Sequence, residues 1–127
     1  MAGETILIVD DNPANLKLAR VVLRVAGYNA QVANDAEQAI RTLETISDKP
    51  QLILMDIQLP GMDGLALTKL LKSNPATEDI IIIALTAYAM KGDEEKARAA
   101  GCDDYISKPI DTETLPRVIA EHLAGKR

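Results

Sequence analysis

The chain has 127 residues, which fits one domain of ordinary size and leaves no room for a second. Apolar residues make up 47% of it, enough to bury a core without disulfides or a structural metal, and a single cysteine excludes an intramolecular disulfide. The net charge of −5, the lack of a Lys or Arg cluster and the absence of Trp and Phe argue against direct nucleic-acid binding.

Cysteine and histidine occur once each and suggest no chemistry of their own. Cys102 is expected to be a packing residue near a helix end and His122 a solvated residue on a late helix, and one of each argues against structural zinc. The longest apolar stretches, Thr5–Val9 and Ile80–Leu85, are too short to span a bilayer, and the N-terminus shows no secretory signal. We therefore expect a cytoplasmic protein without membrane association.

The chain begins with a strand pattern followed by a helix pattern. Thr5–Val9 is apolar throughout, as in a strand covered on both faces. Asn12 can cap a first helix with Pro13 at its first position, and Gly27 is expected to stop it. Ala30–Ala33 then predicts a second, weaker strand.

The same alternation continues through the middle of the chain. Asp35 can cap a second helix, which has an apolar stripe over residues 36–46. Leu52–Met55 predicts the third strand. After a turn at Pro60–Gly61, leucines within residues 67–71 mark a short third helix.

The last part of the chain predicts two more strand–helix pairs. Ile80–Leu85 is the most apolar strand, and residues from about 90 to 100 form a polar, loosely patterned fourth helix. Tyr105–Ile106 is a short fifth strand, and apolar residues within 115–123 indicate a fifth helix. Pro116 lies inside or near the first turn of that helix, so the pattern does not fix its start.

Five strands alternating with five helices indicate an α/β fold of (βα)5 type. Such a chain forms a doubly wound parallel sheet with helices on both faces and right-handed connections. The strand order 2-1-3-4-5 is adopted by analogy with flavodoxin-like proteins of this size.

Every strand except the second is followed by, or ends in, a distinctive polar residue. These residues are Asp10 and Asp11, Asp56, Thr86 and Lys108. In an open parallel sheet, ligands bind outside the carboxyl ends of the strands, where strands one and three are neighbours in the adopted order. Three carboxylates, a hydroxyl and an ammonium are thus expected to converge, and carboxylates so close together need a compensating cation. Mg²⁺ prefers such oxygen ligands and accepts phosphate oxygens as well, which suggests phosphoryl transfer.

Each of these residues alone carries little information. A single Asp at a strand end is most often a helix cap, and a Lys-Pro pair is usually a turn. Their agreement at one end of four strands makes coincidence a poor explanation. Together with their neighbours they form four motifs, which are Ile6–Asn12, Leu54–Gly64, Ala84–Ala87 and Tyr105–Pro109.

In order and spacing, these four motifs resemble the receiver domain of two-component response regulators, and the resemblance covers essentially the whole chain. It implies that Asp56 is the phosphoacceptor. It also implies that Asp11, Asp56 and the Gln58 carbonyl are Mg²⁺ ligands, that Asp10 assists through water, and that Mn²⁺ could replace Mg²⁺.

The resemblance further implies a set of phosphoryl contacts. The matching positions are Thr86, the Ala87 amide, Lys108 and Gln58. Lys108–Pro109 matches a peptide bond that is commonly cis in the family.

A conformational switch is implied as well, through Thr86 and Tyr105, in which the tyrosine moves inward once the threonine is drawn to the phosphate. The polar fourth helix should then be easily displaced, although its composition also suits a solvated helix without a moving role. Gln58 and Tyr88 fall at positions that tune dephosphorylation in the family.

The function expected from the resemblance is that of a phosphoacceptor in two-component or phosphorelay signalling. The donor is a sensor histidine kinase or a histidine phosphotransfer protein. The chain is expected to catalyse no reaction beyond its own phosphorylation and slow dephosphorylation. Residues 1–127 are expected to be a single receiver domain without an output domain, similar to single-domain cell-division and polarity regulators and to hybrid-kinase receivers. Output is expected through a protein target on the face of the fourth helix, fifth strand and fifth helix.

Three other classes of protein fit the sequence less well. A flavin- or nucleotide-binding protein would need phosphate-binding amides after the first strand, where this chain has an anionic loop and Pro13. A phosphohydrolase with an aspartyl nucleophile would need a second acid two residues after it, where this chain has Gln58. A receiver that has lost phosphorylation and only binds partners would not need the five polar residues that this chain keeps, which are Asp10, Asp11, Asp56, Thr86 and Lys108.

Overall fold

The computed structural model describes residues 3–46, 49–59, 61–86, 91–108 and 110–125. In this part of the chain, one sheet of five parallel strands has the order β2-β1-β3-β4-β5, which confirms the flavodoxin-like fold expected from the sequence. The strands are β1 (Thr5–Val9), β2 (Asn29–Ala33), β3 (Leu52–Asp56), β4 (Ile81–Thr86) and β5 (Asp104–Ser107).

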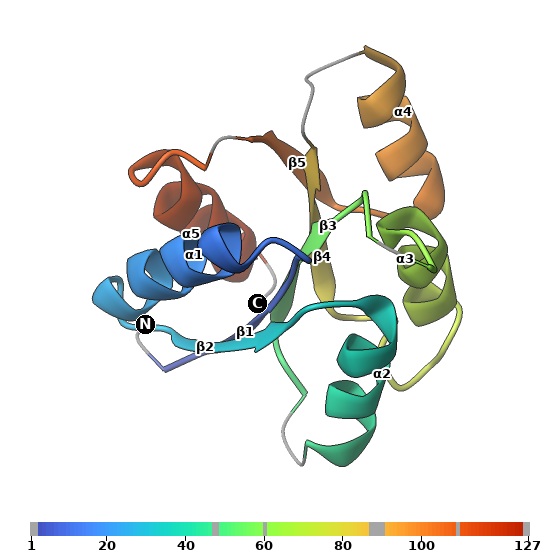
Figure 1. The fold of residues 1–127 in the computed structure, drawn as a ribbon, viewed down its shortest axis with the longest axis horizontal. Helices are drawn as coiled ribbons and strands as arrows, with labels where there is room; N and C mark the ends of the chain where they lie inside the picture. Colours follow the sequence, from blue (N-terminus) through green and yellow to red (C-terminus); the bar gives the residue numbers. More distant parts are fainter. Residues whose placement is uncertain (1–2, 47–48, 60, 87–90, 109, 126–127) are drawn as a thin grey trace.

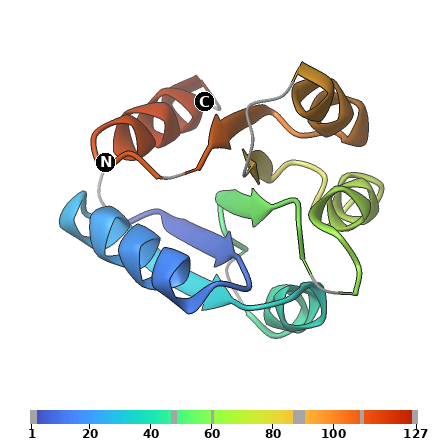
Figure 2. The ribbon, with the colours of Figure 1, turned by 45° about the horizontal axis from the view of Figure 1, so that its top comes forward.

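Helices cover both faces of the sheet. They are α1 (Pro13–Val25), α2 (Ala36–Thr45), α3 (Gly64–Lys72), α4 (Lys91–Ala100) and α5 (Thr114–Gly125). Helices α1 and α5 lie on one face, and α2, α3 and α4 lie on the other (Figures 1 and 2). No helix in the described ranges is long and apolar enough to cross a membrane.

Successive side chains along each strand point to opposite faces of the sheet and pack into two separate apolar layers. Ile6, Ile8 and Leu54 pack under α1 and α5, whereas Leu7 and Ile53 pack under the three helices of the other face. All five side chains are fully buried. Burial on both faces explains why β1, β3 and β4 are continuous apolar runs rather than alternating patterns.

The helix starts follow the capping residues seen in the sequence. The Asn12 side chain accepts hydrogen bonds from the amides of Ala14 and Asn15, at 2.9 and 3.2 Å, and Pro13 occupies the first helical position of α1. The Asp35 carboxylate accepts a hydrogen bond from the Gln38 amide at the start of α2.

Most differences from the expected boundaries are one or two residues. Strand β3 extends to Asp56 because that residue still pairs with Leu85, and β5 runs from Asp104 to Ser107 alongside β4. Helix α5 begins at Thr114, so Pro116 is its third residue, where a missing amide costs no intrahelical hydrogen bond.

The parallel register brings the functional ends of the strands to the same edge of the sheet. Val9 pairs with Met55, Asp56 with Leu85, and Thr86 with Ser107. The residues that follow β1, β3, β4 and β5 therefore leave the sheet side by side at its carboxyl edge.

Candidate functional site

Three carboxylates gather at the carboxyl edge of the sheet. Asp10 and Asp11 follow β1, and Asp56 is the last residue of β3. Each offers an oxygen, and these three oxygens lie within 4.8 Å of one another. Asp10 and Asp56 are buried, with exposed fractions of 0% and 3%, whereas Asp11 is exposed. The cluster therefore consists of two buried carboxylates and one that faces solvent.

Local backbone amides hold the two buried carboxylates. Oδ1 of Asp10 accepts a hydrogen bond from the Asn12 amide at 2.9 Å, in the same turn that caps α1. Oδ1 of Asp56 accepts one from the Gln58 amide, also at 2.9 Å. In both residues one oxygen is used locally, so Oδ2 is left to face the centre of the site.

Helix α3 begins directly against the backbone of Asp56. The Gly64 amide donates to the Ile57 carbonyl at 3.2 Å, and a Cβ added at Gly64 would lie 2.1 Å from the Asp56 carbonyl oxygen and 2.7 Å from Ile57 Cα. Only glycine permits this approach. Gly64 is therefore a positioning residue for Asp56, and its role was not recognised from the sequence.

Lys108 supplies the positive charge of the site. Its Nζ donates a hydrogen bond to Asp56 Oδ2 at 3.1 Å and lies at the same distance from Asp10 Oδ2, in an ion pair. Its backbone amide donates to the Thr86 carbonyl at 2.6 Å. The end of β5 is thus tied to β4 while its lysine bridges the carboxylates of β1 and β3.

The electrostatics of the site follow from burial and like charge. Burial raises the pKa of Asp56 above its ordinary value, and the charge of Asp10 raises it further, although the Gln58 amide and Lys108 act in the opposite direction. For Lys108, burial lowers the pKa, but hydrogen bonding and attraction to Asp56 and Asp10 outweigh it and leave the pKa raised. One lysine thus leaves part of the carboxylate charge uncompensated.

One buried polar atom of the site, Oγ1 of Thr86, has no hydrogen-bond partner among the described residues. Oδ2 of Asp10 is also buried and, among the same residues, is held only by its ion pair with Lys108. Unpaired buried polar atoms are rare because each costs roughly 1–3 kcal/mol. The hydroxyl can donate to an added oxygen, and the carboxylate can bind a cation, so the arrangement suits a divalent cation together with an anion.

The donor set fits Mg²⁺. Asp10, Asp11 and Asp56 provide only oxygen ligands, and Mg²⁺ is usually held by one or two carboxylates while waters and phosphate oxygens complete its coordination. The three side chains expected from the sequence are therefore placed together. The Gln58 side chain is exposed.

The remaining expected site residues are placed as follows. Thr86 ends β4 with its hydroxyl buried. Tyr105 on β5 is half-buried against the layer beneath α2, α3 and α4, and the neighbouring Glu94 carboxylate on α4 raises the pKa of its hydroxyl. Ala87, Tyr88 and Pro109 lie outside the described residues, and with them the expected amide contact and the cis peptide bond.

Cys102 is buried, as expected of a packing residue.

The expectation of a solvated His122 was wrong. His122 Nε2 on α5 lies 2.8 Å from Oδ2 of Asp104 on β5, and only 26% of the histidine side chain is exposed. The Asp104 carboxylate also accepts a hydrogen bond from the Tyr105 amide. This pair joins β5 to α5 beside Tyr105, and no local pattern indicates a contact between residues 18 positions apart.

Comparison with protein families gives one match over most of the chain. The family described as "Response regulator receiver domain" matches residues 6–120. This range contains the three carboxylates of the site together with Thr86, Tyr105 and Lys108.

Among curated proteins, the chain is similar to polar-differentiation response regulators called DivK. It is 44% identical over 116 residues to DivK of Brucella anthropi, an alignment that covers 91% of this chain and 90% of that protein. DivK of Brucella ovis shows the same identity and the same coverage of both chains.

Solved structures of receiver domains superpose closely on the chain. The receiver domain of the sensor histidine kinase PA1611 from Pseudomonas aeruginosa, which has a magnesium ion in its active-site cleft, gives a TM-score of 0.84 at 38% identity and covers 94% and 97% of the two chains. A CheY-like receiver domain from Methanospirillum hungatei gives 0.88 at 30% identity and covers 98% and 97%.

Proposed function

The chain belongs to the response regulator receiver family, and from this premise we propose that Asp56 is its phosphoacceptor. The observation that carries the proposal is the buried cluster at the carboxyl edge of the sheet. Asp10, Asp56 and Lys108 meet there beside a buried Thr86 hydroxyl that has no partner among the described residues. This arrangement is costly for a resting protein and is completed by a cation and a phosphoryl group.

The reaction is transfer of a phosphoryl group to a carboxylate oxygen of Asp56. In the transfer, the bond from phosphorus to a donor histidine nitrogen, or to the acyl oxygen of a small acyl phosphate, breaks while a bond to an Asp56 oxygen forms. The imidazole or the carboxylate of the donor leaves, and the product is an acyl phosphate on Asp56. Asp10, Asp11, Asp56 and the Gln58 carbonyl would hold Mg²⁺, which would supply positive charge to the carboxylates and the phosphoryl oxygens, and Mn²⁺ is expected to substitute. Lys108 keeps its contact to Asp10 and gains one to the phosphoryl group.

Phosphorylation would then act on packing through Thr86 and Tyr105. The modification adds about −1.5 to −2 charges and three acceptor oxygens. The Thr86 hydroxyl gains a partner by moving toward them, and the space that it leaves can be filled by the half-buried Tyr105 ring. Ala87 and Gln58 are expected to add phosphoryl contacts.

Partners and setting follow from the same proposal. The phosphodonor is a sensor histidine kinase or a histidine phosphotransfer protein, and the signal leaves through a protein that binds the α4–β5–α5 face. A cytoplasmic location and a lack of activity beyond its own phosphorylation and slow dephosphorylation stay predictions.

The proposal is tested by intact-mass measurement after incubation with Mg²⁺ and acetyl phosphate. We expect the mass of one phosphoryl group on the wild type, none on Asp56→Asn, and little without Mg²⁺. Asp63→Asn is the matched control, because Asp63 is an exposed carboxylate in the loop that follows β3. An equal adduct on Asp56→Asn, or none on the wild type, would overturn the assignment.

A phosphohydrolase of similar architecture remains the main rival. Asp56 would be its nucleophile, but the position two residues later is the exposed, uncharged Gln58, which cannot act as a general acid or base. Sustained release of phosphate from p-nitrophenyl phosphate by the wild type would favour the hydrolase over the signalling role.

A further inference from the structure

Helix α1 places three positive charges on one face, although they are not consecutive in the sequence. It carries Lys17, Arg20 and Arg24 and no acidic residue, in a chain with a net charge of −5. Spacings of three and four residues place these cations along one side of the helix. All three are exposed, and within the described ranges none forms an ion pair with a carboxylate.

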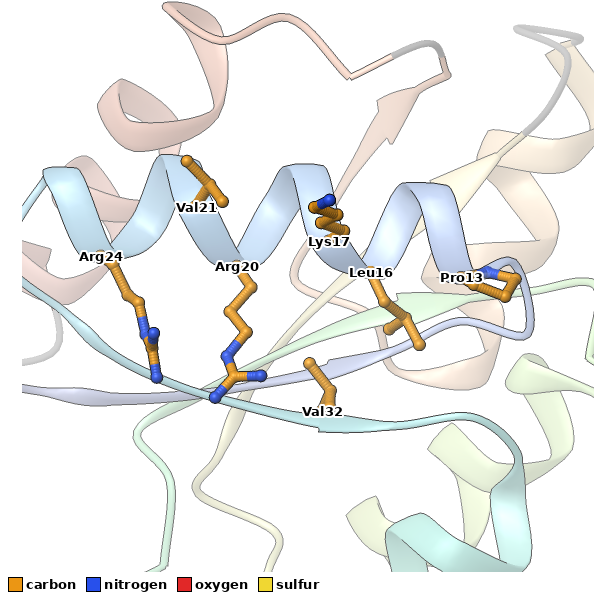
Figure 3. A pocket seen from close by; sticks show the side chains of 7 residues that line it. All are labelled: Pro13, Leu16, Lys17, Arg20, Val21, Arg24 and Val32. Atoms are coloured by element: carbon orange, nitrogen blue, oxygen red, sulfur yellow. The ribbon is translucent and has the colours of Figure 1, made fainter.

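A groove of about 380 Å³ runs between this helix and strand β2 (Figure 3). The side chains of Arg20 and Arg24 extend from α1 toward β2, and Leu16 points toward Val32 across the floor. Leu16 and Val32 are both half-buried. Since β2 lies at the edge of the sheet and pairs with β1, the groove opens to solvent along one side.

The lining combines three cationic side chains with an apolar floor. Its charged members are Lys17, Arg20 and Arg24, so no carboxylate in the lining repels an anion. Its floor is apolar and its volume falls within the roughly 300–1,000 Å³ of small-ligand sites. Charge at the rim with an apolar base is the pattern that holds an amphipathic anion.

We infer that this groove binds a soluble anion that carries two phosphate groups on an apolar or aromatic body, such as a nucleoside diphosphate. Arginine suits phosphate because its planar fork can donate two parallel hydrogen bonds. Arg20 and Arg24 lie one turn apart, about 6 Å along the helix, so each can reach a different phosphate of one ligand. Leu16 and Val32 would contact the body of the ligand, and Lys17 adds charge at the rim.

The site is separate from the phosphoacceptor site. None of Asp10, Asp56 or Lys108 lines the groove. Binding there needs neither Mg²⁺ nor phosphorylation, so the inference can fail while the proposed function stands, and the reverse also holds.

The experiment is a fluorescence titration with mant-ADP in EDTA at about 0.15 M salt, where exposed charges more than about 8 Å apart are largely screened. We expect saturable binding to the wild type and to Asp56→Asn. The double variant Arg20→Gln, Arg24→Gln should bind mant-ADP at least about a hundredfold more weakly, which is about tenfold for each arginine removed. Amide shifts in the NMR spectrum should map to α1 and β2.

The control is Arg117→Gln, which removes an exposed arginine from α5 and should leave binding unchanged. All replaced arginines are exposed, so the variants should fold, and circular dichroism checks this. Adenosine and inorganic pyrophosphate should each bind more weakly than mant-ADP. Undetectable binding, equal binding to the double variant, or binding only to phosphatidylglycerol vesicles or to an acidic peptide would overturn the inference.

Discussion

Asp56 and Asp10 show how a buried charge can be kept in a small fold. Each has one oxygen bound by a local amide and the other turned toward Lys108, so the lysine is shared between two carboxylates that repel each other. Such a cluster is stable enough to persist but is destabilising relative to neutral replacements. We therefore expect the Asp56 carboxylate, which the proposed function needs, to lower the stability of the folded protein.

Asp56→Asn should be more stable than the wild type at neutral pH without Mg²⁺. Burial raises the pKa of Asp56 in the folded protein, so the folded state favours the protonated carboxyl. The stability that the protonated side chain contributes is fully present below the pKa of the unfolded chain and is lost as the pH rises through the pKa of the folded protein. At pH 7 the ionised side chain therefore lowers the free energy of unfolding, and asparagine removes that effect while Lys108 stays paired with Asp10.

The measurement is urea unfolding of both proteins from pH 7 down to pH 3. The difference in the free energy of unfolding between Asp56→Asn and the wild type should become smaller as the pH falls. Mg²⁺ should also reduce this difference at pH 7, because it stabilises the wild type. A less stable Asp56→Asn at pH 7 without Mg²⁺ contradicts this electrostatic account.

Thr86→Val should leave stability unchanged or raise it by about 1 kcal/mol. Its hydroxyl is buried without a partner in the described part of the chain, so removing it relieves an unsatisfied group rather than breaking a hydrogen bond. Asp56 should still accept a phosphoryl group, but the structural response to it should be lost. Urea unfolding checks the first part, and a loss of more than about 1 kcal/mol would show that the hydroxyl is paired.

Gly64→Ala should lower the free energy of unfolding by about 1–3 kcal/mol and slow phosphorylation. The new Cβ would overlap the Asp56 carbonyl oxygen and push the end of β3 away from α3. Gly92→Ala is the matched control because nothing lies near its Cβ position and it sits within α4, where alanine is favourable. Equal behaviour of the two variants would refute the positioning role of Gly64.

At the scale of elements, α4 is the helix with the least apolar anchorage. Among its residues with described side chains, only Ala97 and Ala100 are buried, and both are small. Glu94 and Arg98 form an exposed ion pair, and such pairs contribute roughly 0–1 kcal/mol. By contrast α3 anchors through buried Leu67 and Leu71.

Hydrogen exchange should therefore speed up in α4 and β5 when Asp56 is phosphorylated, whereas amides of α2 should not change. The physical reason is that movement of Thr86 and Tyr105 loosens the little packing that holds α4. Exchange measured by mass spectrometry with and without acetyl phosphate and Mg²⁺ provides the check. Unchanged protection across residues 91–105 would remove α4 from the switch.

The sequence predicted the elements well because strands β1, β3 and β4 are buried on both faces and the helix caps are local signals, as at Asn12 and Asp35. The gathering of Asp10, Asp11 and Asp56 also followed from parallel strands ending at one edge. The strand order itself came by analogy. The approach of Gly64 to Asp56 and the contact of His122 with Asp104 could not be predicted, since both depend on how separate elements dock.

At the scale of the whole molecule, the two faces of the sheet carry different features. The α1 side has the basic groove, and the other side has α4 with its few buried apolar side chains, while the proposed phosphoacceptor site lies between them at the carboxyl edge. Lys108 connects Asp56 to β4 and β5, because its side chain binds the Asp56 carboxylate and its amide donates to the Thr86 carbonyl. Strand β5 in turn contacts α4.

The central claim is that Asp56 itself carries the phosphoryl group. Acyl phosphates are reduced by sodium borohydride, which converts a phosphorylated aspartate to homoserine and leaves free carboxylates intact. After phosphorylation with acetyl phosphate and Mg²⁺, reduction and peptide mapping by mass spectrometry should find homoserine at position 56 and at no other aspartate. Homoserine at position 10 or 11, or at none, would contradict the account.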